Sequence, residues 1–276
     1  MAAVAPDVKV QKAICVGNRP VGRDALVLAV QTPQAIPELV AGRFFMLRRQ
    51  DALSPLIPRP FSIYRQPSTH EFEFLVKVHG RGTQALSLCE PGDALTLIGP
   101  LGNGWPALGS EPGDVLLVAG GIGSAPFFMA IHQALHNGVD PARIVLVYGG
   151  RSADFLYDLD LFSALGVRIV AATDDGSAGF HGNVVQAAQA LVDGGFGQNG
   201  ATVYTCGPDP MMKAVVKFAE SRGFPAWVSL ETYMGCSVGI CNGCAVGTCE
   251  AGSLGEWPVA KCCIDGPVFR ASDIRF

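Results

Sequence analysis

The chain has 276 residues, with 20 Lys and Arg against 24 Asp and Glu for a net charge of −4. These charges are interspersed and form no basic block, which argues against nucleic-acid binding. Although 49% of the residues are apolar, the longest purely apolar runs, 115–119 and 144–147, are far too short to span a bilayer. At about 100–200 residues per domain, the length predicts two domains with room for a small third.

Residues 1–104 contain short apolar runs that are separated by turns. The runs lie at residues 25–30, 42–47, 72–78 and 94–98. Short strands at such spacing, without a long helical pattern between them, are typical of a small antiparallel barrel. We therefore predict a β-barrel domain over 1–104.

Strand-like and helix-like stretches alternate over residues 105–225. The apolar run 114–119 is followed by a helix-like stretch at 125–135, and further runs lie at 144–148, 167–171 and 202–205. This alternation predicts a parallel sheet with helices on both faces. The remaining residues, 226–276, are too few to fold around a core of their own. The predicted fold class is α+β multidomain: an antiparallel β-barrel, a parallel-sheet α/β domain and a small C-terminal domain.

Six of the nine cysteines lie between residues 236 and 263. The odd number of cysteines, and the absence of a secretory pattern in residues 1–10, argue against a disulfide framework. We expect a cytoplasmic protein, in which such a cluster is typical of a metal site. The spacing of Cys236, Cys241 and Cys244 is C-x4-C-x2-C, which is characteristic of plant-type 2Fe–2S clusters.

The spacing leaves the fourth ligand open among Cys249, Cys262 and Cys263. Adjacent cysteines rarely both reach one iron, so we expect one member of the Cys262–Cys263 pair to be a bystander. A structural zinc site is the alternative, although zinc sites usually contain two C-x2-C pairs and only one is present. For Cys15 and Cys89 we expect the role of small buried apolar residues.

A glycine loop follows the apolar run 114–119, before a helix that we expect to be capped by Ser124. Backbone N–H groups at such a helix start favour a pyrophosphate, whereas the alternative is simply a tight turn. A second turn follows the run 202–205, where a parallel sheet presents ligands at its carboxyl edge. Cys206 in that turn is a candidate to lie near a reacting nicotinamide, or else an inert buried thiol. The candidate residues of the two turns are Gly120, Gly121, Gly123, Cys206, Gly207 and Pro208.

The barrel region carries two further motifs. Residues 59–62 read Arg-Pro-Phe-Ser, and a guanidinium fork suits a pyrophosphate, although a lone Arg59 is more often a surface ion-pair residue. Residues 75–77 read Leu-Val-Lys, and we expect their strand to end in a glycine turn at Gly82 and Thr83.

These motifs, in this order, resemble the ferredoxin–NADP⁺ reductase superfamily. Further matching stretches are 99–104, 173–177, 229–231 and 265–269, so that the resemblance spans essentially the whole chain. The cysteine loop and its closing residues narrow it to the electron-transfer subunits of NAD-dependent dihydroorotate dehydrogenases. The closing residues Gly-Pro-Val-Phe include Val268, where we expect Glu in other branches of the superfamily.

The resemblance implies a flavin-binding barrel, a nicotinamide-binding α/β domain and a 2Fe–2S domain, with boundaries at 104/105 and 225/226. The resemblance implies that the nucleotide is NAD. The residues alone do not decide between NAD and NADP, because Arg151 could bind the 2′-phosphate of NADP. The resemblance favours Cys263 over Cys262 as the fourth ligand and gives Cys249 no role. It implies cluster ligands at Cys236, Cys241, Cys244 and Cys263. It implies FAD contacts at Arg59, Pro60, Phe61, Ser62, Leu75, Val76, Lys77, Gly82 and Thr83.

The resemblance also implies a partner, an FMN-containing dihydroorotate dehydrogenase catalytic subunit, in a heterotetramer of two plus two chains. Electrons would then pass from FMN through the cluster and FAD to NAD⁺, in pyrimidine biosynthesis. One alternative is an NAD(P)H-dependent ferredoxin reductase or a hydrogenase or sulfide dehydrogenase diaphorase subunit. An alternative of another class is a non-enzymatic zinc-containing interaction module.

Overall fold

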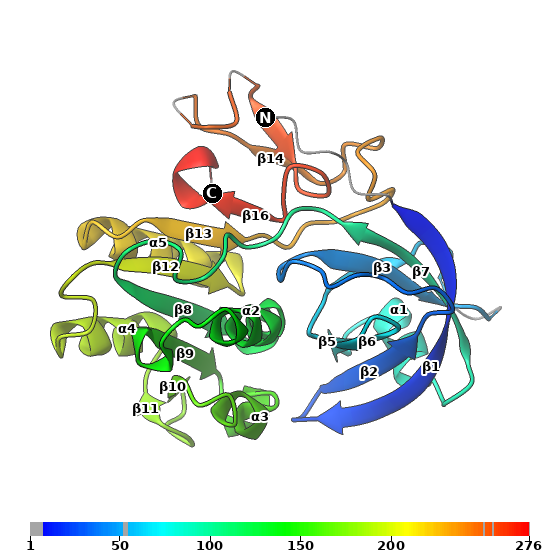
Figure 1. Cartoon of the computed structure of the whole chain (residues 1–276), viewed down its shortest axis with the longest axis horizontal. Coiled ribbons are helices and arrows are strands. Elements are labelled where there is room, and N and C mark those ends of the chain that lie inside the picture. The colour runs from blue at the N-terminus through cyan, green and yellow to red at the C-terminus, as the bar shows by residue number, and fades with distance from the viewer. Residues whose placement is uncertain (1–7, 52–54, 251, 256, 276) are drawn as a thin grey trace.

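The computed structural model describes residues 8–51, 55–250, 252–255 and 257–275. Two seven-stranded sheets lie side by side, and the cysteine-rich C-terminal part lies across their upper edges (Figure 1). The predicted arrangement of an antiparallel flavin-type sheet, a mostly parallel sheet and a small C-terminal domain is confirmed.

The first sheet is antiparallel and curls into a half-barrel, with strand order β4-β3-β7-β1-β2-β6-β5. Its two edge strands, β4 and β5, are consecutive in the chain, and the Tyr64 N–H between them donates to the Glu73 carbonyl on β6 (3.0 Å). This link draws β4 towards β6. The strands are β1 (Lys9–Val21), β2 (Ala25–Gln31), β3 (Phe44–Arg49), β4 (Arg59–Ser62), β5 (Arg65–Ser68), β6 (Glu71–Lys77) and β7 (Ala94–Leu101).

One expectation in this sheet is wrong. The segment after β6, expected as a glycine turn, begins the helix α1 (Arg81–Ser87). The hydroxyl of Thr83 accepts the N–H groups of His79 (3.0 Å) and Gly80 (3.1 Å), and these bonds satisfy donors at the helix start.

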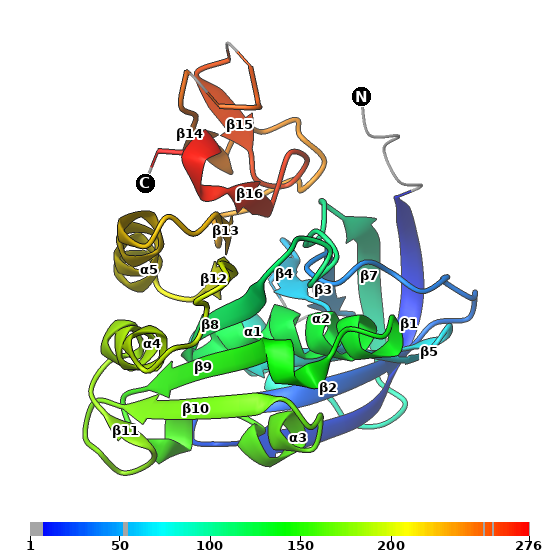
Figure 2. The ribbon, with the colours of Figure 1, turned by 60° about the vertical axis from the view of Figure 1, so that its left-hand side comes forward.

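The second sheet has the order β11-β10-β9-β8-β12-β13-β16 and is parallel except for β16. Alternate residues of β8 face opposite sides: Leu117 packs with α2 and α3, whereas Leu116 packs with α4 and α5. Helices therefore cover both faces (Figure 2), as predicted. The elements are β8 (Asp114–Gly120), α2 (Ala125–His136), β9 (Ile144–Gly150), α3 (Leu159–Ser163), β10 (Arg168–Thr173), β11 (Phe180–His181), α4 (Val184–Asp193), β12 (Ala201–Cys206), α5 (Asp209–Ser221), β13 (Ala226–Ser229) and β16 (Val268–Arg270).

The C-terminal part shares structure with both sheets. β13 pairs with β12 and β16 pairs with β13, so the second sheet continues beyond the boundary expected at residue 225. The cysteine-rich loops between them include the hairpin of β14 (Ala245–Gly247) and β15 (Val259–Lys261). Their core also contains Phe44, Met46 and Leu101 of the first sheet. A segment this short is therefore stabilised by packing on its neighbours.

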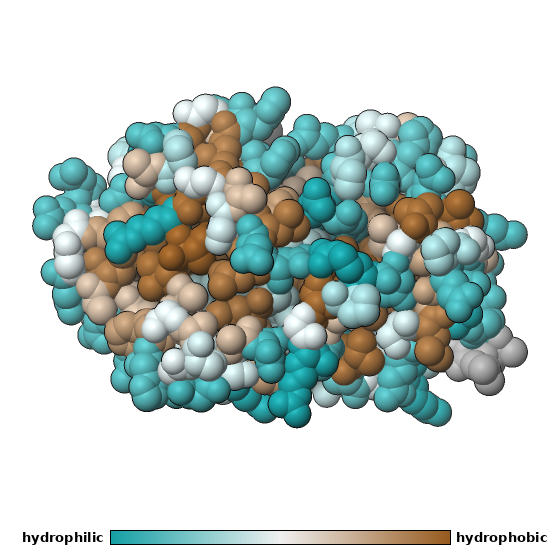
Figure 3. All heavy atoms as spheres, turned by 90° about the horizontal axis from the view of Figure 1, so that it is seen from below, coloured by the Kyte–Doolittle hydropathy of each residue, from teal (hydrophilic) through white to brown (hydrophobic). Residues whose placement is uncertain are grey.

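The face seen from below mixes polar and apolar residues, with the largest apolar area on the half formed by the parallel sheet (Figure 3). Within the described ranges, every helix is too short or too polar to cross a membrane.

Candidate functional site

The two glycine turns of the second sheet meet at its carboxyl edge. β8 and β12 are neighbours, with Ala119 opposite Cys206, so the loops that follow them lie together. A Cβ added to Gly123 would lie 2.3 Å from the Cys206 carbonyl oxygen, and one added to Gly207 would lie 3.0 Å from the Gly120 nitrogen. Only glycine allows this backbone contact, which forms the edge where such sheets bind nucleotides.

The glycine loop itself forms one turn of 3-10 helix, Gly121–Ser124, that leads into α2. Gly121 has a left-handed φ of +52°, and the space beyond its Cβ position is open. Ser124 occupies the expected N-cap position, but its hydroxyl makes no capping bond and instead donates to the Tyr148 hydroxyl (2.9 Å). The expected cap is therefore wrong in its bonding.

Cys206 is half-buried beside β13, where it lies opposite Ser229. Burial, with a smaller contribution from the Glu231 carboxylate, raises the pKa of the Cys206 thiol to about 12. The side chain is thus a neutral thiol at physiological pH, and its reactivity as a nucleophile is low.

The two flavin-type motifs are brought together at the opening of the half-barrel. The Arg59 side chain on β4 lies against Gly82 of α1, where an added Cβ would come 3.1 Å from Arg59 Cγ. The Arg59 guanidinium donates to the Ile57 carbonyl (2.7 Å). Pro60, Phe61 and Ser62 are half-buried along the same strand. The contact between Arg59 and Gly82 fits an anion-binding guanidinium held against a side-chain-free backbone.

Residues 75–77, which are also predicted FAD contacts, differ from one another in exposure. Leu75 and Val76 are buried in the core, whereas Lys77 is partly exposed, with its ammonium 3.4 Å from Asp24 and 5.6 Å from the centre of the Phe155 ring. The Thr83 hydroxyl is already engaged as the helix cap. Of these predicted FAD contacts, Lys77 therefore offers a side chain, and Leu75 and Val76 offer backbone.

The cysteine sulfurs form two pairs. Cys244 Sγ and Cys263 Sγ are 3.2 Å apart in the buried core of the C-terminal part. Cys236 Sγ accepts the N–H of Cys241 (3.3 Å), and the Cys241 side chain lies within reach of it. The structure thus pairs each of the four cysteines that the family pattern indicates with another of the four.

Cys262 points away from these pairs. It is fully buried, and its thiol is directed at the Leu230 carbonyl (3.6 Å). Cys249, which is half-buried, follows β14, and its backbone N–H donates to the Asp273 carbonyl. The direction of the side chains separates the two members of the Cys262–Cys263 doublet.

The loop backbone suits thiolate sulfurs. The N–H groups of Cys241 and Val238 lower the pKa of Cys236 to about 6, which favours its thiolate form. Ser237 and Asn242 adopt left-handed φ values of +56°, so the loop is tightly coiled. Burial raises the pKa of the Cys263 thiol to about 12, so this sulfur ionises readily only beside a compensating cation.

The arrangement in pairs also bears on the kind of metal. Among the described residues, no three His, Cys, Asp or Glu side chains converge on one point as ligands of a single ion. Two thiolates on each of two irons is the ligation of a 2Fe–2S cluster. The pairs Cys236–Cys241 and Cys244–Cys263 match that ligation.

Two functional connections were missed by sequence reasoning. Asn103 Nδ2 donates to the carbonyls of Asp265 (2.9 Å) and Val268 (2.8 Å), and this side chain joins the first sheet to the C-terminal part. Tyr157 donates to Asp24 across the two sheets. The only sequence signal for the Asn103 connection was its place in the 99–104 stretch. The bond between Tyr157 and Asp24 had no sequence signal.

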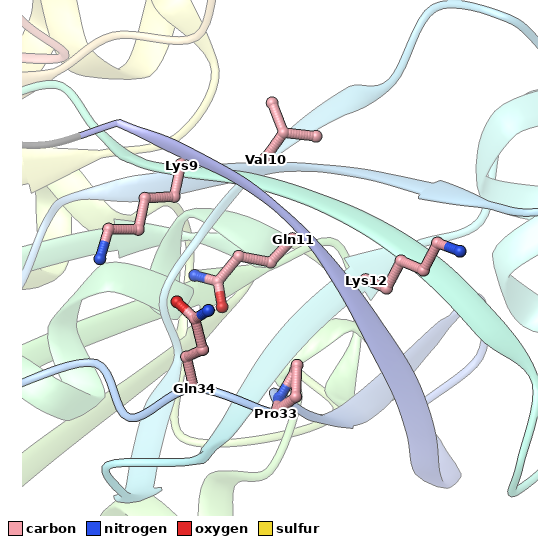
Figure 4. Close-up of a pocket in the computed structure, with 6 residues that line it drawn as sticks. All are labelled: Lys9, Val10, Gln11, Lys12, Pro33 and Gln34. Atoms are coloured by element: carbon pink, nitrogen blue, oxygen red, sulfur yellow. The ribbon is translucent and has the colours of Figure 1, made fainter.

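Two cavities lie away from these motifs. One of about 360 Å³ lies beside β1, where the amides of Gln11 and Gln34 face each other (Figure 4). It is lined by Lys9, Val10, Gln11, Lys12, Pro33 and Gln34. A second, of about 150 Å³, lies between α5 and the strands β13 and β16. Neither lining contains a residue of the predicted site.

Three family models match the chain in succession. They describe an oxidoreductase FAD-binding domain over residues 16–105, an oxidoreductase NAD-binding domain over 117–217, and the iron-sulfur cluster binding domain of dihydroorotate dehydrogenase B over 231–275. The chain is an oxidoreductase subunit with FAD-binding, NAD-binding and iron–sulfur domains on a ferredoxin reductase-like fold.

Curated relatives are more specific. The chain is 36% identical over 236 residues to the dihydroorotate dehydrogenase B (NAD(+)) electron transfer subunit of Geobacillus thermodenitrificans, with 84% of this chain and 86% of that protein covered. It is 30% identical over 267 residues to the corresponding subunit of Bacillus cereus, with 96% and 98% covered. The chain therefore belongs to the family of dihydroorotate dehydrogenase B electron transfer subunits.

One similar solved structure is a ferredoxin-linked oxidoreductase, the class named above as an alternative function. An NADH-dependent reduced ferredoxin-NADP oxidoreductase, described in connection with flavin-based electron bifurcation, superposes with a TM-score of 0.81 at 28% identity, covering 100% of this chain and 91% of that one. A ferredoxin reductase of carbazole 1,9a-dioxygenase has a TM-score of 0.67 at 22% identity, with 79% and 67% covered, and supports the fold alone.

Proposed function

We propose that this subunit passes electrons from the FMN of a dihydroorotate dehydrogenase catalytic subunit, through a 2Fe–2S cluster and FAD, to NAD⁺. The observation that carries this route is the position of the cysteine pairs. Cys244 and Cys263 share a core with Met46 of β3, and Met46 is the register partner of Pro60 on the flavin motif strand β4. The cysteine core therefore includes a residue of β3, the strand that pairs directly with the flavin motif strand β4, and this adjacency supports a short path for electrons.

The number of electrons that each group transfers determines its role in the proposed route. A 2Fe–2S cluster supplies one electron at a time, a nicotinamide accepts two as a hydride, and a flavin supplies the chemistry that joins them. The chain's own residues hold and orient these groups. Arg59 with Gly82, Lys77 and the backbone of residues 75–76 are proposed for FAD. The two glycine turns are proposed for NAD⁺, and Cys236, Cys241, Cys244 and Cys263 for the cluster.

The proposed docking surface for the catalytic subunit surrounds Cys241, the exposed member of the cysteine pairs. Tyr233 is 94% exposed, Ile240 79% and Ile264 52%. Large apolar side chains gathered at one exposed site are typical of protein interfaces. A partner that covered them would also shield the cluster, and two such pairs would give the proposed heterotetramer. We also propose a cytoplasmic location, which is typical of proteins whose clustered cysteines bind metal instead of forming disulfides.

A ferredoxin-linked reductase is the second candidate, favoured by the solved structure at 28% identity. The two candidate functions differ in the protein that donates electrons to this subunit. Co-purification with a dihydroorotate dehydrogenase catalytic subunit, followed by an assay of dihydroorotate-driven NAD⁺ reduction, separates them. We expect turnover by the complex and none by the isolated subunit; activity with reduced ferredoxin alone would favour the second candidate.

The route predicts a divided phenotype for Cys241→Ser. This variant should lose the cluster and dihydroorotate-driven NAD⁺ reduction, yet retain NADH-to-dye activity through FAD. Cys249→Ser, at a cysteine outside the two pairs, serves as the matched control and should keep both activities. Retention of a full 2Fe–2S EPR signal by Cys241→Ser would refute the ligand assignment.

A further inference from the structure

A continuous set of hydrogen bonds connects the glycine loop of the second sheet to the first sheet. The Tyr148 hydroxyl on β9 accepts from Ser124 Oγ (2.9 Å) and from the backbone N–H of Tyr157 (2.7 Å). Ser124, Tyr148 and Tyr157 are all fully buried. Because Ser124 ends the glycine loop and begins α2, Tyr148 fixes that loop to the segment around Tyr157.

The connection then crosses to the first sheet. The Tyr157 hydroxyl donates to Asp24 Oδ1 (2.5 Å), and Asp24 Oδ2 lies 3.4 Å from the Lys77 ammonium. The Asp24 carbonyl accepts the N–H of Val78 (2.8 Å), so both the backbone and the side chain of Asp24 contact the end of β6. We call the series Ser124, Tyr148, Tyr157 and Asp24 the hydroxyl chain.

Close packing surrounds the crossing point. Gly22, in the turn before Asp24, has a φ of +56°, and an added Cβ would lie 2.8 Å from the Tyr157 ring. Nearby, Arg19 of β1 binds both carboxylate oxygens of Asp158 (2.8 and 2.7 Å). The interface is therefore specified at this point by several fully paired polar groups, which is how buried networks select one arrangement.

We propose that the hydroxyl chain positions the nicotinamide loop relative to the end of β6, where Lys77 is the proposed flavin contact. Tyr157 and Asp24 are then positioning residues for hydride transfer between NAD(H) and FAD. This inference rests on the proposed function, because it takes residues 121–124 as the nucleotide loop and Lys77 as a flavin contact. The two halves of the reaction centre lie on different domains. Hydride transfer requires reacting atoms about 3–3.5 Å apart, and a misplacement of about 1 Å can slow a reaction 100-fold.

The test uses Tyr157→Phe in the full-length chain with its FAD, since this change removes one hydroxyl and keeps the ring. We expect single-turnover flavin reduction at saturating NADH to be roughly 10-fold slower, with little change in the NADH dissociation constant. Tyr204→Phe, which removes a hydroxyl outside the hydroxyl chain on β12, is the matched control and should react like the parent.

Amide hydrogen exchange provides a readout that is independent of activity. In Tyr157→Phe we expect exchange of residues 121–124 and 22–24 to be roughly 10-fold faster, while β8 and β9 keep their protection. A flavin-reduction rate within about twofold of the parent, or a loss expressed wholly in NADH affinity, would overturn the positioning role.

Two changes at Asp24 separate positioning from simple destabilisation. Asp24→Asn keeps an oxygen that accepts from Tyr157, so its rate should stay closer to that of the parent than the rate of Tyr157→Phe. Asp24→Ala should be at least as slow as Tyr157→Phe, because it also removes the ion pair with Lys77. The double variant Tyr157→Phe with Asp24→Ala should be no slower than Asp24→Ala alone, because the bond that Tyr157→Phe removes is already absent there. Additive losses would overturn the proposal. Failure of NADH to reduce the flavin of the parent chain would instead refute the proposed function itself.

Discussion

The two adjacent cysteines at 262 and 263 are both buried, but their sulfurs have different partners. Cys263 Sγ lies 3.2 Å from Cys244 Sγ, while the Cys262 thiol is directed at the Leu230 carbonyl (3.6 Å). The sequence left the choice between them open, because spacing does not state where a side chain points. A family pattern favoured Cys263, and its assignment as the fourth ligand stays a prediction that the 3.2 Å approach to Cys244 supports.

This geometry predicts opposite outcomes for two substitutions. Cys263→Ser should lose iron and acid-labile sulfide, because one iron would lack a thiolate. Cys262→Ser should keep both and lower the free energy of unfolding by about 1–3 kcal/mol, since it places a hydroxyl in an apolar core. Iron and sulfide analysis of the two proteins checks this, and full iron content in Cys263→Ser would contradict it.

Cys206 gives a second prediction for a single residue. Its pKa is raised to about 12, so the thiolate is scarce between pH 7 and 9. In that range we expect alkylation by iodoacetamide to be far slower than for a free cysteine, and to accelerate only as pH rises towards 12. Peptide mapping by mass spectrometry measures the rate. Fast labelling at pH 7 would show that Cys206 is an activated thiol.

Elements differ in how far the sequence determined them. Strands β8 and β9 were predictable because they are continuous apolar runs, buried on both faces of a parallel sheet. Strand β16 was not, because it has three residues and pairs with β13, about forty residues earlier. Helix α1 was missed because Gly80 precedes it and Gly82 is its second residue, and because the Thr83 cap that starts it is a local hydrogen bond rather than a periodic pattern.

The meeting of the two glycine turns predicts a specific sensitivity at Gly123. Gly123→Ala places a Cβ 2.3 Å from the Cys206 carbonyl, so the backbone must move. We expect a loss of roughly 1–3 kcal/mol in the free energy of unfolding, together with a clear rise in KM for NADH. Steady-state kinetics and thermal unfolding measure both.

Gly138→Ala is the matched control for that change. Gly138 has a φ of +84° but open space around its Cβ position, so alanine there adds only backbone strain of about 1–2 kcal/mol. Its KM for NADH should be unchanged. An equal rise in KM in both variants would mean that the turn contact has no specific role in nucleotide binding.

On the scale of the whole molecule, the cysteine-rich part depends on its neighbours. Its core includes Phe44 and Met46 of the first sheet, and β16 completes the second sheet. No sequence pattern predicted the contacts with the first sheet and the loop after it, because they join residues more than 150 positions apart, as with Asn103 and Val268. The site depends on them, since they set the distance from the cysteine pairs to the flavin motif.

Asn103 tests this dependence. Asn103→Ala removes hydrogen bonds to Asp265 and Val268, and we expect a loss of about 2–3 kcal/mol. Dihydroorotate-driven NAD⁺ reduction by the complex should fall, while NADH-to-dye activity is retained. Asn18→Ala, which removes bonds to the Leu86, Ser87 and Cys89 carbonyls within the first sheet's own domain, is the control and should keep both activities. An equal loss of dihydroorotate-driven NAD⁺ reduction in both variants would contradict the proposed dependence on Asn103.

The most direct measurement is the metal and flavin content of the full-length chain after anaerobic purification. The account predicts about two irons and two acid-labile sulfides per chain, as in a 2Fe–2S cluster, together with bound FAD. A colourless protein that contains zinc, without iron or sulfide, would contradict it and would identify the chain as a non-redox module.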